Sequence, residues 1–183
     1  MVYIRFDFDP LKAKEIIVYL AKRRKELTKS PATIRDILKL MYFADRLSLQ
    51  KFGRFLCNNN YVAMEQGPVP SEAYDLIKEV REKGDEDNIH GFEVYNNYRF
   101  RILRDADLDY LSDSDILCMN EVLEQYGSLS SRRLMEESHD SVWKNAWDSY
   151  PEDRSVPIKI SSIIETLSDN DNLLDYLIEG NCD

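Results

Sequence analysis

His139 is the residue of this 183-residue chain with the clearest potential for chemistry, because a histidine can act as a general acid, a general base or a metal ligand near neutral pH. The only other histidine is His90, so one chain cannot build a multi-histidine metal site. Tyr42 and Asp45 offer a hydroxyl and a carboxylate to a hydrolase built around His139. No nucleophile–base pair is visible in the spacing of these residues, so the sequence favours a protein that is not an enzyme.

Other catalytic and ligand-binding patterns are missing from the sequence. Asp105, Asp107 and Asp109 alternate like the start of a calcium loop, but Tyr110 follows where the loop requires glycine. Cys118 lies among apolar residues without a basic neighbour, which predicts an inert, buried thiol. With six glycines, the chain contains no phosphate-binding loop, dinucleotide fingerprint or GxSxG turn. We therefore expect neither a metal nor a cofactor.

Composition limits the class of protein and its partners. A hydrophobic content of 43% suits one domain with a single core. No apolar run is long enough to span a membrane, the first residues do not resemble a signal peptide, and three unpaired-looking cysteines indicate a reducing compartment, so we expect a cytoplasmic protein. A net charge of −10 disfavours nucleic acid and suits a basic protein partner, although it can also serve solubility alone.

Three motifs occur in order along the chain. Residues 39–46 read KLMYFADR, residues 61–70 read YVAMEQGPVP, and residues 139–147 read HDSVWKNAW. Together they resemble the Panacea domain, a family of bacterial and phage antitoxins and phage-associated proteins. The resemblance runs from about Leu11 to Trp147, with Val142 where the family usually has proline.

This resemblance implies a non-catalytic antitoxin that neutralises a toxin encoded by an adjacent gene through direct protein–protein binding. Some members of the family act instead as adaptors that deliver the toxin to a protease. The resemblance leaves open the identity of the toxin and the choice between these two modes.

The elements that must position these motifs are mainly helical. Asp9 and Pro10 begin a first helix, an apolar helix over about 33–51 forms the centre of the core, and further helices begin at Ser71, Ser112 and Ser130. Residues 61–64 and a hairpin over 92–102 with a two-residue Asn96-Asn97 turn predict a small sheet. Helices over 158–167 and 173–178 end the chain.

The predicted fold is therefore a mainly α, single compact domain with a small antiparallel β-sheet or hairpin. We assign residues 1–160 to the Panacea-like domain. Residues 161–183 contain no basic residue, so we expect an acidic helical segment that packs on this domain or extends from it.

The candidate partner-binding residues lie on the three motifs. Each also has a structural interpretation: Asp45 as an acid paired with Arg46 or a backbone amide, the Gly-Pro-Val segment as a rigid turn, and Trp143 with Trp147 as core packing. A position near a helix end favours a cationic His139. The candidates are Tyr42, Asp45, Gly67, Pro68, Val69, His139 and Trp143.

A nucleic-acid-binding regulator is the main alternative. The order helix, helix, strand, helix, hairpin is similar to that of a winged helix, and Arg99, Arg101 and Arg104 would make its wing basic. The overall acidity and the lack of a base-reading helix oppose this interpretation.

Overall fold

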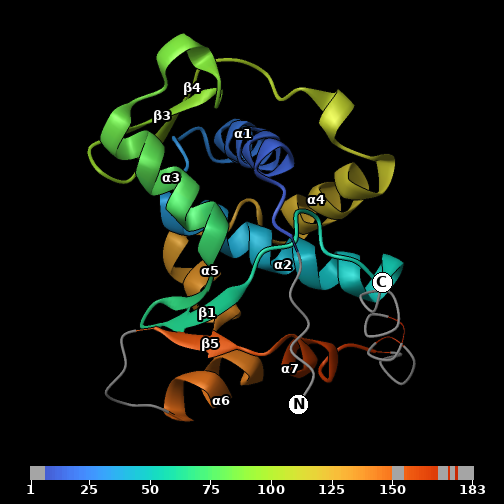
Figure 1. The fold of residues 1–183 in the computed structure, drawn as a ribbon. Helices are drawn as coiled ribbons and strands as arrows, with labels where there is room; N and C mark the ends of the chain where they lie inside the picture. Colours follow the sequence, from blue (N-terminus) through green and yellow to red (C-terminus); the bar gives the residue numbers. More distant parts are fainter. Residues whose placement is uncertain (1–6, 150–154, 169–172, 174–175, 177–183) are drawn as a thin grey trace.

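A long buried helix organises the molecule. The computed structural model describes residues 7–149, 155–168, 173 and 176. Within this part, α2 (Ile34–Phe52) crosses the centre and contacts α1 (Pro10–Thr28), α4 (Asp113–Tyr126) and α5 (Ser131–Ser138). Figure 1 shows α1 above α2 and the larger sheet with α6 (Ser141–Ser149) below it. The prediction of a mainly α, single-domain fold is confirmed.

The helices begin where local side chains satisfy the first free N–H groups. Asp9 accepts a bond from the backbone of Lys12 and precedes Pro10, and Ser130 caps α5 in the same way. Ser112 and Asp115 form the reciprocal pair of a capping box at the start of α4. These three predicted helix starts are confirmed.

Two separate small sheets take the place of the single sheet that we predicted. β1 (Tyr61–Met64) lies between β2 (Gly67–Pro70) and β5 (Val156–Ile158), and both pairings are antiparallel. β3 (Phe92–Tyr95) and β4 (Arg99–Ile102) form the second, two-stranded sheet, and α3 (Ser71–Lys83) packs beside β3.

Two boundaries differ from the prediction for identifiable reasons. The β3–β4 turn has three residues, 96–98, because Tyr95 pairs with Arg99. Ile158, where we predicted a helix to begin, is the last residue of strand β5, because it pairs with Tyr61 of β1. The helix that follows, α7 (Ile160–Ile164), is correspondingly shorter than predicted.

The end of the described chain contributes to the core. Ile160, Ile163 and Ile164 of α7 are buried in the main hydrophobic cluster. The domain boundary predicted after residue 160 thus falls inside α7, and the helix predicted over 173–178 lies largely outside the described residues. None of the described helices has the length and apolar character that a membrane crossing requires.

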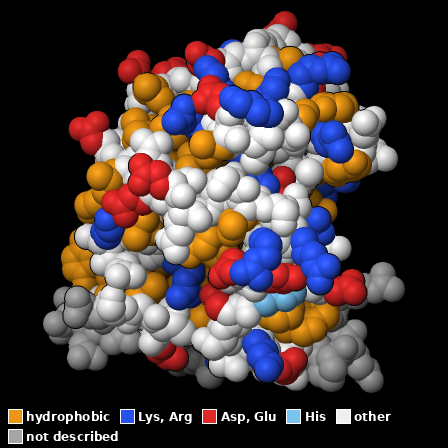
Figure 2. Space-filling model, turned by 180° about the vertical axis from the view of Figure 1, so that it is seen from behind, with side chains coloured by type: hydrophobic (Ala, Val, Ile, Leu, Met, Phe, Trp, Pro, Cys, Tyr) orange, Lys and Arg blue, Asp and Glu red, His pale blue; other side chains and the backbone are white. Residues whose placement is uncertain are grey.

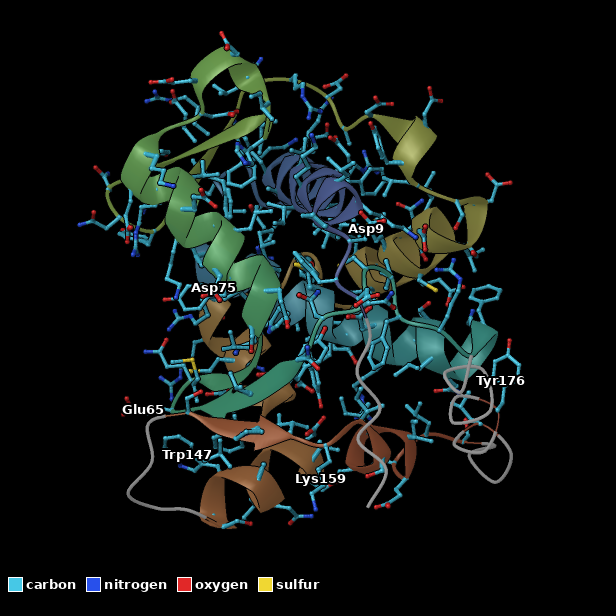
Figure 3. The ribbon with its side chains drawn as sticks, in the orientation of Figure 1. Asp9, Glu65, Asp75, Trp147, Lys159 and Tyr176 are labelled. Carbon is cyan, nitrogen blue, oxygen red and sulfur yellow. The ribbon has the colours of Figure 1, made fainter. Side chains whose placement is uncertain are left out.

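Three short segments connect the remaining elements. Two are 3₁₀ turns, η1 (Glu86–Asn88) and η2 (Leu108–Tyr110). The third is the tight turn between β1 and β2, which places Glu65 and Gln66 at the surface. Figure 3 shows Glu65 in this turn and Trp147 of α6 at the same edge of the molecule.

Candidate partner-binding surface

Three segments that are distant in sequence meet around the β1–β2 turn. They are the middle of α2, the turn with strand β2, and the junction of α5 and α6. The seven candidate residues all lie on these segments: Tyr42, Asp45, Gly67, Pro68, Val69, His139 and Trp143. The structure divides them into buried residues below the surface and partly exposed rings upon it.

Asp140 joins α2 to α6. Its Oδ2 accepts a 2.8 Å hydrogen bond from the Tyr42 hydroxyl and lies 3.4 Å from the Arg46 guanidinium. Its Oδ1 accepts the backbone N–H of Trp143, so the same carboxylate caps the first turn of α6. Burial and the charge of Asp140 raise the pKa of the Tyr42 hydroxyl far above its usual range, so Tyr42 remains a neutral donor.

Three aromatic rings lie in a row next to Asp140. The His139 and Trp143 rings stack with 3.9 Å between centroids, and Trp147 stacks beyond Trp143 at 6.2 Å. The Trp143 Nε1–H donates a 2.8 Å bond to the backbone carbonyl of Met64, at the end of β1. We call His139, Trp143 and Trp147, with Met64 and Gln66 beside them, the aromatic face. Each of the three rings is partly exposed.

Gly67 permits the close approach of the β1–β2 turn to this row. Its φ of 103° lies in a region that side chains rarely adopt. A Cβ at this position would lie 2.6 Å from the Ser138 hydroxyl and 3.2 Å from the His139 ring. The glycine therefore both makes the turn and seats it against the α5–α6 junction.

Asp45 occupies the interior instead of the surface. Its Oδ1 accepts the Leu56 backbone N–H at 2.7 Å, and its Oδ2 accepts the Tyr61 hydroxyl at 2.5 Å. Burial raises the pKa of the Asp45 carboxyl to about 6, against the opposing effect of these two bonds. The carboxylate thus ties α2 to β1 and to the loop before it.

His139 is not the helix-end cation that its position suggested. Burial, followed by the nearby positive charge of Lys39, lowers the pKa of the His139 imidazole. Its Nε2 is buried and has no hydrogen-bond partner among the described residues. A neutral ring stacked on Trp143 is the form that this environment favours.

Lys39 is a fully buried lysine of the first motif. Its Nζ donates a 2.8 Å bond to the backbone carbonyl of Pro68 and thereby holds β2 against α2. Burial, with a further contribution from Arg35, lowers the pKa of the Lys39 ammonium to about 7.

The geometry does not assemble the hydrolase that Tyr42, Asp45 and His139 suggested. Tyr42 bonds to Asp140, Asp45 bonds to Tyr61 and Leu56, and His139 stacks on Trp143, so none of the three activates another. Cys118 is buried, and burial raises the pKa of its thiol to about 11. In the described part of the chain, no three metal-ligating side chains are grouped to hold an ion.

Asp140 and Lys39 are the important residues that the sequence analysis did not single out. Asp140 directly precedes Ser141, and an Asp immediately before a helix is a capping signal that could have identified it from the sequence. Lys39 lies in a helix whose neighbours Leu38 and Leu40 are apolar, which is unusual enough to indicate a special environment.

The basic residues of the proposed wing are mostly engaged within the protein. Arg104 binds the buried Glu15 carboxylate through two 2.7 Å bonds, and Arg101 pairs with Glu93 across the hairpin. Arg99 lies over the Tyr98 ring. The hairpin also belongs to a sheet separate from that of β1.

Comparison with known proteins identifies the family. The family model of the antitoxin SocA-like Panacea domain matches residues 37–144, which is more than half of the chain and includes every candidate residue. Neither the curated proteins nor the solved structures gave a match. The matched region contains most of α2, the β1–β2 turn and the start of α6, which contribute to the surface described above. The chain therefore belongs to the SocA-like antitoxin family that carries the Panacea domain.

Proposed function

We propose that this protein is the antitoxin of a toxin–antitoxin pair and that it neutralises its toxin by direct binding through the aromatic face. The observation that carries the proposal is the family match over residues 37–144. This match includes every residue of the aromatic face except Trp147. The toxin is proposed to be the product of an adjacent gene and to meet the antitoxin in the cytoplasm.

The chemistry of the aromatic face suits a protein partner. Tryptophan is among the commonest energetic anchors of protein interfaces, because its ring buries a large area and its N–H can be satisfied. Trp143 already satisfies its N–H through Met64, and its ring is clamped between His139 and Trp147. A pre-ordered row of rings loses little conformational entropy when a partner binds. Figure 2 shows the molecule from behind, where hydrophobic, basic and acidic side chains adjoin around a histidine.

The buried candidate residues support this face from below. Tyr42 orients Asp140 and thereby α6, while Asp45 fixes β1 through Tyr61. Gly67 and the Pro68 carbonyl set the turn against α5 and α2. In this proposal they are positioning residues, and contact with the toxin comes from the rings.

Co-expression of each neighbouring gene with this protein tests the proposal. One neighbour should stop growth alone and be tolerated with the antitoxin, and the two products should co-purify in a fixed ratio. Trp147→Ala should weaken the complex by about 30-fold or more, because loss of an interface anchor costs at least about 2 kcal/mol. The matched control is Tyr110→Ala, which removes an exposed ring of η2.

The proposal fails if no neighbour is toxic, or if purified antitoxin recovers no stoichiometric partner. Direct inhibition and delivery to a protease give different results in purified components. Direct inhibition requires that the toxin lose activity on mixing while its amount stays constant. Delivery to a protease requires that toxin disappear only in cells or mixtures that contain the protease.

Binding to duplex DNA tests the regulator alternative. With a net charge of −10 and the hairpin arginines engaged internally, we expect no tight DNA binding at physiological salt. A gel-shift titration that showed salt-dependent binding near ~1 µM would favour the regulator, because this is the tight end of non-specific affinity.

A further inference from the structure

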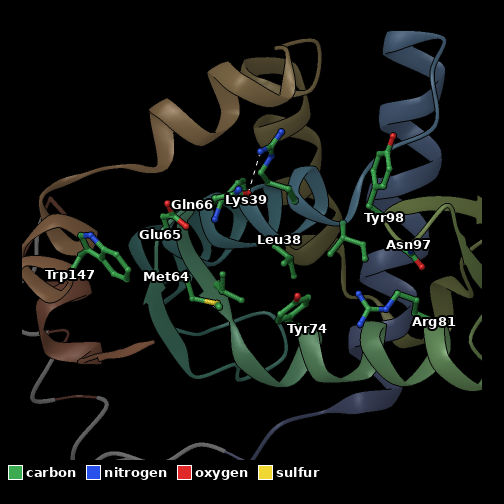
Figure 4. A pocket seen from close by; sticks show the side chains of 13 residues that line it. Leu38, Lys39, Met64, Glu65, Gln66, Tyr74, Arg81, Asn97, Tyr98 and Trp147 are labelled. Atoms are coloured by element: carbon green, nitrogen blue, oxygen red, sulfur yellow. Dashed lines mark hydrogen bonds between the residues drawn. The ribbon is translucent and has the colours of Figure 1, made fainter. Parts of the chain in front are cut away.

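A pocket opens beside the aromatic face. Its volume is about 780 Å³, and it lies between α2, the β1–β2 turn, α3 and the β3–β4 turn, with Trp147 of α6 at one end. Figure 4 shows Tyr74 and Arg81 reaching into it from α3, and Tyr98 of the hairpin and Lys39 of α2 are among its lining residues. A pocket of this size accommodates a few side chains of a partner.

Two basic side chains on one helix face line this pocket, and neither has a carboxylate partner among the described residues. Arg35 and Lys39 are four residues apart on α2, so they lie on the same side and repel each other. Among the described residues, neither forms an ion pair within 4.0 Å. Within the described part of the chain, Arg35 Nη1 reaches only the Gln66 side chain at 3.2 Å, and its Nε is buried without a partner. Lys39 bonds there only to the Pro68 carbonyl.

The rest of the lining adds to the excess of basic over acidic side chains in the pocket. Arg81 is a third cation of the pocket, and its ion pair with Glu82 has a long distance of 3.7 Å. Among the described residues that line the pocket, Glu65 is the one acid. The chain as a whole has 34 acidic against 24 basic residues, so a pocket in which basic residues outnumber acidic ones is a local exception. Clustered cations of this kind are stabilised when an anionic group binds between them.

The remaining walls are apolar and aromatic. Leu38 and Met64 contribute aliphatic side chains, and Tyr74, Tyr98 and Trp147 contribute rings. A ligand that fits must therefore present a negative group for Arg35 and Arg81 and an apolar group for these walls. A carboxylate side chain next to an apolar side chain in a polypeptide meets both requirements.

We propose that this pocket binds an acidic side chain of the toxin, together with an apolar residue beside it. The inference rests on the proposed antitoxin function and names the chemistry that the partner must supply. Continuity supports a polypeptide occupant, because Met64, Gln66 and Trp147 belong to both the pocket and the aromatic face. A chain that lies across the rings can thus extend one of its side chains toward Arg35.

The first test measures the affinity of purified antitoxin variants for the co-purified toxin. Arg35→Gln and Arg81→Gln should each weaken the complex by about 30-fold or more, since truncating one partner of a buried charge pair costs at least about 2 kcal/mol. Arg23→Gln makes the same change on α1, where Arg23 pairs with Glu26 outside this pocket, and should leave affinity unchanged. Melting temperatures near that of the wild type establish that the variants fold.

The second test locates the toxin segment. A photo-crosslinking amino acid in place of Tyr98 should capture a toxin peptide that contains Asp or Glu. Changing that acid to Lys should abolish binding to the wild type and restore binding to Arg35→Glu. Reciprocal recovery is specific to a direct charge contact, because two unrelated defects would add.

The outcomes separate this inference from the function on which it rests. If wild-type antitoxin binds no toxin, the proposed function fails. If it binds toxin and neither arginine variant weakens the complex more than Arg23→Gln does, the pocket inference alone is overturned. It is also overturned if inorganic phosphate or ATP at micromolar concentration raises the melting temperature of the wild type but not of Arg35→Gln, because the pocket would then be a small-anion site.

Discussion

The Tyr42 hydroxyl and the Asp140 carboxylate form a 2.8 Å hydrogen bond between residues 98 positions apart in the chain. One partner is at the centre of the core helix, and the other caps α6 and thereby sets the angle of the tryptophan row. This bond couples the interior of the domain to the surface that we propose binds the toxin.

Tyr42→Phe should therefore weaken both stability and toxin binding. The substitution keeps the ring but removes a donor to a charged acceptor, which costs about 1.5–3 kcal/mol in unfolding free energy. Urea denaturation measures this loss, and titration with toxin measures the effect on affinity.

Tyr19→Phe is the matched control, because the Tyr19 hydroxyl donates a 2.8 Å bond to Asn120 between α1 and α4. It should lower stability by a similar or smaller amount and leave toxin affinity unchanged. Equal losses of affinity in the two variants would show that Tyr42 acts only through global stability.

Gly67→Ala should destabilise the protein more than Gly84→Ala does. Both glycines have positive φ, 103° and 80°, so both substitutions strain the backbone. A Cβ at Gly84 meets nothing within 4 Å, whereas one at Gly67 lies 2.6 Å from the Ser138 hydroxyl. We expect about 1–2 kcal/mol for Gly84→Ala and a clearly larger loss for Gly67→Ala in denaturant midpoints. Equal losses would mean that the turn moves freely away from α5.

Features that depend on neighbouring residues were predictable from the sequence. Asp9, Ser112 and Ser130 cap helices through bonds to backbone groups three residues further on. Their role therefore depends on a short stretch of local sequence. The hairpin and β1 were likewise predictable from composition and turn residues.

Features that depend on residues distant in sequence could not be predicted in this way. Ile158, where the predicted helix begins, lies instead in a strand, because Ile158 pairs with Tyr61 and Val156 pairs with Ala63. Tyr42, His139 and Trp143 could be proposed from the motifs, but Asp140, which connects them, required the fold. Lys39 was overlooked because lysine is almost never fully buried without a partner.

Asp45→Asn should remove a pH-dependent component of stability. The folded-state pKa of Asp45 is raised from 3.8 to about 6, so the native protein holds this proton more tightly than the unfolded chain does. Stability from this group is present at low pH and decreases as pH rises from about 4 to about 6. Above that window the ionised group reduces stability by up to about 3 kcal/mol, given about 1.4 kcal/mol per pKa unit.

Other carboxylates titrate in the same pH range. The measurement is therefore the difference in unfolding free energy between the wild type and Asp45→Asn, followed from pH 3.5 to 7. Glu15 and Asp85 have lowered pKa values and contribute with the opposite sign in both proteins, so their contributions cancel in the difference. A constant difference would show that Asp45 titrates normally. Toxin binding should persist in Asp45→Asn, since the side chain is buried and nearly unchanged in shape.

Lys39→Met should stabilise the protein and flatten its pH dependence above neutrality. The pKa of the ammonium falls from 10.5 to about 7 on folding, so the unfolded chain binds more protons between these values. Wild-type stability should therefore rise as pH increases from 7 to 9. Methionine fills the same space without a charge, and only the bond to the Pro68 carbonyl is lost. The net gain at pH 6 should be about 1–3 kcal/mol.

Lys51→Met, on the same helix but with an exposed ammonium paired to Glu121, should show neither effect. Lower stability of Lys39→Met at pH 6 would mean that the buried ammonium contributes more through its hydrogen bond than it loses through desolvation.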